Sequence, residues 1–240
     1  MTIVLAIDCA AGACSAALCR VRNDGDDVAA LAVAKLPMDR GHAEILMPLL
    51  SRLRDTAEVD WSEIGLIVAT VGPGSFTGVR IGLSAARGIA LATGAPTVAV
   101  QSLEAIAAGV RVGEPSTPLL VALDSRRGDA YGQWHLGGTA RPPAVIPINR
   151  VEIPWVGGPD DASHGADILV AGDLADRLAD HLRATGHPAT AVAGTEAPDP
   201  VVLATLGYRR HAGSGPSPLR PIYLRPADAK PASSRPTGPK

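Results

Sequence analysis

The stretch GPGSFTGVR, residues 72–80, decides how the sequence is interpreted, because it lies between an apolar run and a helical pattern. The run before it, residues 66–71, has the β-branched richness of a buried strand, and the stretch after it has no helix breaker through Thr93 except scattered glycines. The sequence therefore predicts a strand, a glycine-containing loop and a helix, which is the usual arrangement of a phosphate-binding loop.

Three specific motifs do not fit this loop. A Walker loop places Lys after its closing glycine, whereas Val79 and Arg80 stand there. A dinucleotide fingerprint requires glycine where Thr77 stands, and Ser75 lacks the flanking glycines of a nucleophile elbow. We therefore interpret the loop as structural or partner-contacting. It comprises Gly72, Pro73, Gly74, Ser75, Thr77 and Arg80.

The composition is that of a soluble globular protein without a strong charge of either sign. The 240 residues are 46% hydrophobic and only 3% aromatic, so alanine, valine and leucine fill the core. Lys and Arg number 22 against 24 Asp and Glu, and the net charge of -2 creates no field that attracts nucleic acid or anionic lipid. Asp8 interrupts the apolar N-terminus, and no run reaches the about 18 apolar residues of a membrane span. We therefore expect a cytoplasmic protein without membrane contact.

The apolar periodicity predicts an α/β lobe at the N-terminus. Three strands come first and form an antiparallel meander, because short polar or glycine-containing connections join them. A helix, a strand, a helix, a strand and a helix follow, which gives the order βββαβαβα. The expected strands are residues 3–8, 13–21, 28–35, 66–71 and 97–100, and the expected helices are residues 41–54, 78–93 and a short one from Ser102.

The sequence also indicates an internal duplication. Residues 119–134 align without gaps on residues 3–18, and residues 168–178 repeat the strand-to-helix step of the first half. The second copy is eroded, because residues 137–165 are rich in Gly and Pro and show little pattern. We predict an N-terminal lobe at 1–110, a C-terminal lobe at 111–225 and a disordered proline-rich tail at 226–240.

The alignment sets Asp124 against Asp8, and these two residues are the candidate cofactor ligands. Each ends the first strand of its lobe. Their carboxylates could hold a metal ion or a phosphate-bound water between the lobes, or each could bond to its own turn. The six histidines never pair at i, i+4 spacing, so no zinc site is expected.

The three cysteines, Cys9, Cys14 and Cys19, are spaced by five residues. An odd step along a strand places neighbours on opposite faces, so we expect that these thiols do not converge on a metal ion. We expect them to be buried and reduced, which is the general tendency of free cysteine.

The helix at 78–93 carries small residues four apart, which form a ridge almost without side chains. Glycine inside a helix costs up to about 1 kcal/mol relative to alanine, so the pattern indicates close packing, either within the chain or against another subunit. We predict that this helix and the helix at 41–54 together form a docking surface. The residues assigned to it are His42, Ile45, Leu49, Gly78, Val79, Gly82 and Ala86.

Five segments of the chain together resemble one known family. They are AIDCAAGACSAAL, GHAEILMPLL, VGPGSFTGVRIGLSAARGIA, LDSRRGDAY and PIYLR, and they cover most of the chain through Arg225. In this order they resemble the bacterial TsaB family, also called YeaZ, of tRNA threonylcarbamoyladenosine biosynthesis. The resemblance implies the two-lobed fold of the actin, sugar-kinase and Hsp70 (ASKHA) superfamily. It also implies a non-catalytic subunit of the complex that forms threonylcarbamoyladenosine next to the tRNA anticodon.

The resemblance further implies what the chain binds. The paralogue TsaD would carry the metal and transfer the threonylcarbamoyl group, and the ATPase TsaE would join the pair, so ATP and metal belong to the partners. A homodimer is expected when the chain is alone, and contact with tRNA only through the complex. The family usually has hydroxyl residues where Cys9 and Ala10 stand, which weakens nucleotide binding here. Two alternatives stay open: an autonomous ATPase or kinase of the same fold and, less favoured, a metallopeptidase.

Overall fold

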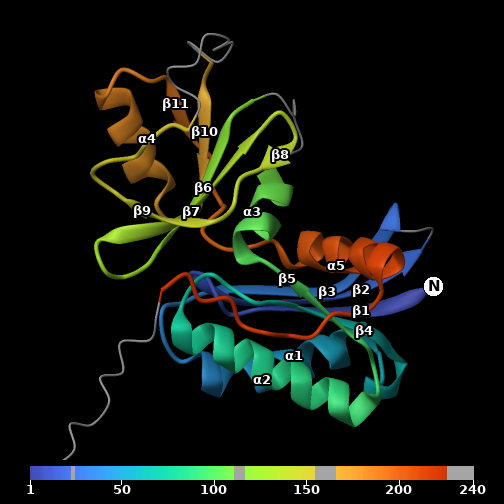
Figure 1. Cartoon of the computed structure of the whole chain (residues 1–240). Helices are drawn as coiled ribbons and strands as arrows, with labels where there is room; N and C mark the ends of the chain where they lie inside the picture. Colours follow the sequence, from blue (N-terminus) through green and yellow to red (C-terminus); the bar gives the residue numbers. More distant parts are fainter. Residues whose placement is uncertain (23–24, 111–116, 155–165, 226–240) are drawn as a thin grey trace, which may run out of the picture.

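The computed structural model describes residues 1–22, 25–110, 117–154 and 166–225, which form two lobes stacked one above the other (Figure 1). The first half of the chain contains β1 (Thr2–Asp8), β2 (Ala13–Arg22), β3 (Asp27–Pro37), α1 (His42–Ala57), the 3-10 turn η2 (Trp61–Glu63), β4 (Ile64–Thr70), α2 (Phe76–Thr93), β5 (Thr97–Val100) and α3 (Ser102–Val110). The second half contains β6 (Leu119–Asp124), β7 (Asp129–Leu136), β8 (Thr139–Ala140), β9 (Ala144–Pro147), β10 (Ile168–Ala171), α4 (Ala175–Ala184), β11 (Ala189–Ala191) and α5 (Pro200–Ser214).

The sheet of the lower lobe has the strand order β3-β2-β1-β4-β5. β1, β2 and β3 pair antiparallel, whereas β4 pairs parallel with β1 and with β5. Alternate side chains of β1 enter two separate clusters: Leu5 and Ile7 pack on the side of α1 and α2, and Val4 and Ala6 on the side of α5. The central strands are therefore apolar on both faces, as expected where helices cover both sides of a sheet (Figure 1).

The sheet of the upper lobe repeats this topology on a smaller scale. Its order is β11-β10-β6-β7-β8, with β9 also pairing with β7. β6 and β7 pair antiparallel, and β10 pairs parallel with β6 and β11, so β6, β7, β10 and β11 correspond to β1, β2, β4 and β5. Leu178 and Leu182 of α4 pack on one face of this sheet. The shared topology confirms the duplication that the sequence indicated.

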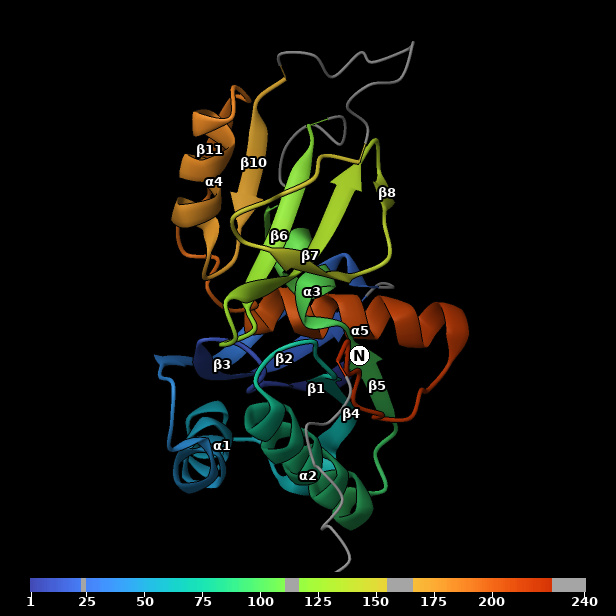
Figure 2. The same cartoon turned by 60° about the vertical axis from the view of Figure 1, so that its left-hand side comes forward.

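The last helix of each half packs against the other half: α3 against the upper sheet and α5 against the lower sheet. Figure 2 shows both helices between the two sheets. Leu103 of α3 packs with Val121 of β6, whereas Leu203 of α5 packs with the lower sheet. An ion pair between Arg210 of α5 and Glu104 of α3 joins the two helices. Because of this exchange, one face of each sheet packs against a helix from the other half of the chain.

The sequence predictions for the fold are largely confirmed. The first lobe has the expected order βββαβαβα, and the fold class is the two-lobed α/β class that the resemblance implied. No helix of the described residues has the length and apolar character that a membrane span requires. The tail at 226–240 and the lobe boundary at 110/111 lie in or beside segments outside the described residues, so both stay predictions. In the poorly patterned region, β8 and β9 form short edge strands beside β7.

Candidate functional site

The loop at residues 72–75 packs directly on the turn between β1 and β2. The backbone N–H of Ser75 donates to the carbonyl oxygen of Ala10 at 2.7 Å, and a Cβ atom on Gly74 would lie 2.1 Å from the same oxygen. Gly72 has a φ of 93°, in the left-handed region that favours glycine. The close approach that these glycines allow is therefore between two segments of this chain.

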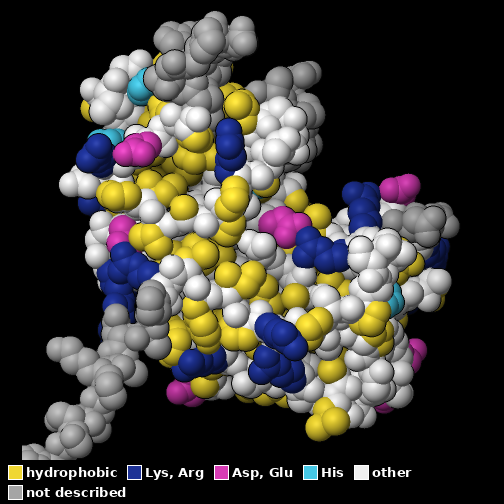
Figure 3. Space-filling model, viewed as in Figure 1, with side chains coloured by type: hydrophobic (Ala, Val, Ile, Leu, Met, Phe, Trp, Pro, Cys, Tyr) yellow, Lys and Arg dark blue, Asp and Glu magenta, His cyan; other side chains and the backbone are white. Residues whose placement is uncertain are grey.

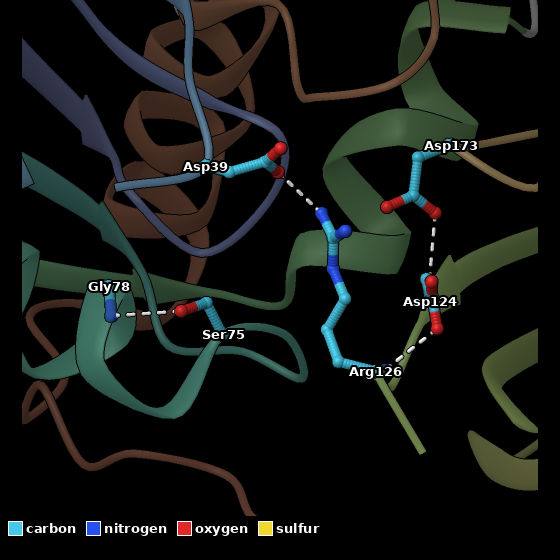
Figure 4. Close-up of polar contacts among 6 residues, drawn as sticks. All are labelled: Asp39, Ser75, Gly78, Asp124, Arg126 and Asp173. Carbon is cyan, nitrogen blue, oxygen red and sulfur yellow. Dashed lines mark hydrogen bonds and ion pairs between the residues drawn. The ribbon is translucent and has the colours of Figure 1, made fainter. Parts of the chain in front are cut away.

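The N-terminus of α2 is capped from within the chain. Ser75 is the N-cap residue, and its Oγ accepts a hydrogen bond from the N–H of Gly78 at 3.2 Å (Figure 4). Two backbone donors that a bound phosphate would need, those of Ser75 and Gly78, thus already have partners. Thr77 and Arg80 point instead to the outer side of α2, where they line a groove. These contacts support the structural interpretation of the loop.

Asp8, at the end of β1, is fully buried. Its Oδ1 accepts hydrogen bonds from Thr70 Oγ1 at 2.6 Å and from the N–H of Ala10 at 3.2 Å, while Oδ2 has no hydrogen-bond partner among the described residues. Desolvation raises the pKa of Asp8 to about 6, and the hydrogen bonds from Thr70 and Ala10 oppose that rise. Burial therefore disfavours the ionised carboxylate that a metal ion requires.

Asp124, at the end of β6, belongs to a separate polar group (Figure 4). Its Oδ1 accepts from the N–H of Arg126 at 2.7 Å, and its own N–H donates to Asp173 Oδ1 at 2.7 Å. Desolvation raises the pKa of Asp173. The Arg126 guanidinium reaches Asp39 at 2.5 Å, which links the two lobes. Because these two side chains are 62% and 69% exposed, the ion pair contributes little stability.

Asp8 and Asp124 thus share one local geometry, in which each carboxylate accepts from the backbone N–H two residues further on. This is the turn-bonding alternative that the sequence left open. Within the described ranges, no group of three or more His, Cys, Asp or Glu could hold a metal ion. Both aspartates make this turn hydrogen bond, and cofactor binding by either of them stays a prediction.

The small-residue ridge of α2 faces the interior, which corrects the prediction that Gly78, Gly82 and Ala86 belong to a docking surface. All three are buried. A Cβ atom on Gly78 would lie 1.9 Å from the carbonyl oxygen of Cys9, and one on Gly82 would lie 3.4 Å from the Cys9 Cβ. The ridge therefore allows α2 to approach the β1–β2 turn closely, and the packing is internal.

The other residues assigned to the docking surface also lie mostly inside. His42, Leu49 and Val79 are buried, and only Ile45 is partly exposed. Their side chains, except that of His42, belong to the apolar cluster between the two helices and the lower sheet. The two predicted helices do lie side by side, but the side chains that they present outward are different ones (Figure 1).

A groove of about 450 Å³ lies between α1 and α2 on the outer side of the lower lobe. Its lining residues are Ala43, Leu46, Met47, Phe76, Thr77, Arg80, Ile81, Ser84 and Ala85. Met47 and Phe76 are each 46% exposed. The Arg80 guanidinium stacks 3.6 Å from the centre of the Phe76 ring, and its Nε donates to the hydroxyl of Tyr223 at 3.0 Å. An exposed apolar surface with an oriented arginine and aromatic rings has the composition of a protein interface.

Cys9 and Cys14 come together, contrary to our expectation, with their Sγ atoms 3.9 Å apart. The register of β1 and β2 ends with the pair of Asp8 and Ser15, and Cys9 and Cys14 are the residues next to that pair in the turn. The odd-step argument holds only along one strand, and the chain reverses between these two residues. It does hold for Cys14 and Cys19, which enter different clusters. All three thiols are free and buried, as predicted.

Comparison with known proteins places the chain in a class. It resembles the structure of the (R)-2-hydroxyglutaryl-CoA dehydratase component A of Acidaminococcus fermentans at a TM-score of 0.50 and 11% identity, over 88% of this chain and all of that one, which shows the fold alone. Together with the duplicated sheets and the exchanged helices, this defines a two-lobed α/β protein of the ASKHA class.

More specific similarities then show the family. Residues 37–179, more than half of the chain, match the family model described as TsaD, tRNA N6-adenosine threonylcarbamoyltransferase. The Escherichia coli tRNA threonylcarbamoyladenosine biosynthesis protein TsaB is 35% identical over 55% of this chain and 58% of its own length. The structure of YeaZ from Pseudomonas aeruginosa matches at a TM-score of 0.73 and 28% identity, over 93% of this chain and all of that one. The chain belongs to the TsaB (YeaZ) family. It spans about half the length of the curated relatives that it matches.

The sequence by itself did not predict three features of these sites: the ion pair of Asp39 and Arg126, the position of Asp173, and the contact of Tyr223 with Phe76. Asp39 and Arg126 meet although 87 residues separate them, which no local pattern indicates. Asp173 lies in the loop between β10 and α4, which corresponds to the loop between β4 and α2. The repeated strand-to-helix pattern could therefore have indicated Asp173 as a candidate site residue. Tyr223 lies in the PIYLR segment, but its contact with Phe76 depends on how the chain returns from α5 to α2.

Proposed function

We propose that this chain is a non-catalytic subunit of the complex that forms threonylcarbamoyladenosine next to the tRNA anticodon. In this proposal it binds a TsaD protein through the groove between α1 and α2, and a TsaE-type ATPase joins the pair. The same surface binds a second copy when the chain is alone. Nucleotide and metal are supplied by the partners, and tRNA contacts this chain only through the complex.

The observation that carries the proposal is the α1–α2 groove in a member of the TsaB family. Met47 and Phe76 expose apolar area there that a bound partner would remove from water. Arg80 is held in one orientation by Phe76 and Tyr223. Oriented arginine and aromatic side chains lose little entropy on binding and are frequent energetic centres of interfaces.

The loop at residues 72–75 and the buried Asp8 carboxyl support an accessory role. The donors of Ser75 and Gly78 are used inside the chain, and the carboxyl of Asp8 is buried with a raised pKa. On the face drawn in Figure 3, Lys and Arg side chains lie in several separate groups among acidic and apolar ones. This agrees with a net charge of -2 and with tRNA binding that depends on a partner.

The direct test is capture of the TsaD protein from the same genome. Met47→Glu should lower the affinity for that protein at least about tenfold, because docking would bury the new carboxylate without a partner. Val33→Glu is the matched control, since Val33 is 48% exposed on β3 and faces the α5 side of the sheet, opposite to the groove. Equal binding by both variants and the unaltered chain would contradict the docking role of the groove.

The cellular role is tested separately. Depletion of the chain should lower threonylcarbamoyladenosine in tRNAs that read codons beginning with A, measured by mass spectrometry of nucleosides. Unchanged levels would remove the tRNA assignment. The purified chain is also expected to release negligible phosphate from ATP; turnover near about 10 per second that Asp8→Ala abolishes would favour the autonomous ATPase instead.

A further inference from the structure

The β1–β2 hairpin places two thiols against each other at its closed end. Cys9 directly follows Asp8 and Cys14 directly precedes Ser15, which are the last paired residues of the hairpin, and both side chains belong to the apolar cluster on the face that α2 covers. Their sulfur atoms are 3.9 Å apart, which is the distance of a thiol–thiol hydrogen bond. Cys19 lies further along β2 on the opposite face, so it cannot compete for either partner.

The hairpin geometry suits a covalent bond between these sulfurs. Facing residues of antiparallel strands have Cα atoms about 4.5–5.5 Å apart, and disulfides join Cα atoms about 4.4–6.8 Å apart. The sulfur atoms must approach from 3.9 Å to the bond length of about 2.05 Å. Rotation of the two side chains can achieve this, because the adjacent pair of Asp8 and Ser15 already holds the two backbones close together.

The hydrogen bond makes the two thiols unequal. Either sulfur can donate in this hydrogen bond. The bond to Cys14, together with burial, raises the pKa of Cys9, whereas the bond to Cys9 lowers the pKa of Cys14. Cys14 is therefore the sulfur that loses its proton first, and Cys9 keeps a proton that can leave with the oxygen of an oxidant.

We propose that Cys9 and Cys14 form a redox site, which closes to an intramolecular disulfide when the chain reacts with a hydroperoxide. The Cys14 thiolate attacks one peroxide oxygen, the O–O bond breaks, and the other oxygen leaves as water or an alcohol after taking a proton. The Cys9 sulfur then attacks the resulting sulfenic acid, its S–O bond breaks, and water leaves with the thiol proton. In total the two thiols lose two protons and two electrons, and the hydroperoxide is reduced.

A metal ion is the weaker occupant for this pair. Soft metal ions bind thiolates, but structural sites of the zinc type use four ligands. Across the described ranges, no third His, Cys, Asp or Glu joins the two thiols in a possible metal site. A disulfide needs no further ligand and leaves no charge in the apolar cluster around the hairpin.

The position of the pair connects it to α2. Ala10, next to Cys9 in the turn, accepts the hydrogen bond from the N–H of Ser75 at the start of α2. The carbonyl oxygen of Cys9 lies against Gly78, and its side chain lies against Gly82. Drawing the Cys9 sulfur toward Cys14 therefore changes a contact surface of the helix that also lines the outer groove.

Access limits the rate of the reaction. Both thiols are buried, so the oxidant reaches them when the turn opens locally at Ala11 and Gly12, which are partly exposed. We therefore expect slower oxidation in the folded chain than in the chain unfolded in urea.

The test uses the reduced full-length chain and hydrogen peroxide as the probe, increased until methionine sulfoxide begins to form. The sample is then denatured, its free thiols are alkylated, and its peptides are mapped by mass spectrometry. The expected result is a Cys9–Cys14 linkage, an alkylated Cys19, and recovery of both thiols after dithiothreitol. Cys19→Ala should form the same linkage, whereas Cys14→Ala should form none. Circular dichroism establishes that both variants are folded.

The unaltered chain by itself tests whether the Cys9–Cys14 disulfide forms, even if a variant does not fold. Full alkylation of Cys9 and Cys14 after the peroxide treatment would overturn the proposal. So would sulfinic acid at either residue without a linkage, a disulfide that includes Cys19, or a disulfide between two chains.

Discussion

The contact between α2 and the β1–β2 turn allows a sharp comparison of two glycines on one helix. Gly78 faces the turn, where a Cβ atom would lie 1.9 Å from the Cys9 carbonyl oxygen, and that oxygen belongs to backbone which cannot rotate away. Overpacking of this kind costs about 3 kcal/mol, at the upper end of the usual range. Alanine recovers up to about 1 kcal/mol of helix propensity. Gly78→Ala should therefore destabilise the chain by about 2 kcal/mol, which lowers the Tm by about 4–8 °C in a chain of this length.

The matched control is Gly88→Ala, ten residues further along α2, where a Cβ atom would meet nothing within 4 Å. This change keeps only the propensity term and should stabilise the chain by about 0.5–1 kcal/mol. Thermal and urea unfolding of the two variants and the unaltered chain measure both effects. A Gly78→Ala variant as stable as Gly88→Ala would refute the close packing of α2 on the turn.

Two further predictions concern charged groups. The pKa of Asp8 is raised from 3.8 to about 6 in the folded chain, so the stability that this group contributes is complete well below pH 3.8 and is lost as the pH rises through 6. Asp8→Asn should reduce the loss of stability between pH 4 and pH 7 by about 2 kcal/mol, as measured by urea unfolding at both pH values. A variant with the same pH dependence as the unaltered chain would contradict the burial of this carboxyl. Arg126 has a φ of 62°, in the left-handed region that favours glycine, so Arg126→Gly should be more stable than Arg126→Ala by about 1 kcal/mol. Both variants lose the ion pair with Asp39, but only glycine relieves the backbone strain; equal melting temperatures would contradict that strain.

Local patterns in the sequence determined the elements of the lower lobe and their order. The β-branched run before residue 72 forms β4, and Ser75 caps α2 where the loop ends. The match between residues 3–18 and 119–134 corresponds to the hairpins β1–β2 and β6–β7, although the turn of the second hairpin is one residue shorter, because Asp8 pairs with Ser15 and Asp124 pairs with Ala130. These features were predictable, because side-chain direction repeats with the backbone period and turn residues act over a few positions.

Only the tertiary structure decided which surfaces these elements meet. The Gly78–Gly82–Ala86 spacing indicated close packing but not its partner, which is the β1–β2 turn of the same chain. The spacing of Cys9 and Cys14 pointed to separation along one strand, and the hairpin register brought the thiols together. The exchange of α3 and α5 joins residues about a hundred positions apart in the chain, as in the pair of Glu104 and Arg210. A periodic pattern gives the direction of a side chain, whereas its neighbour across the core comes from a distant segment that the pattern does not contain.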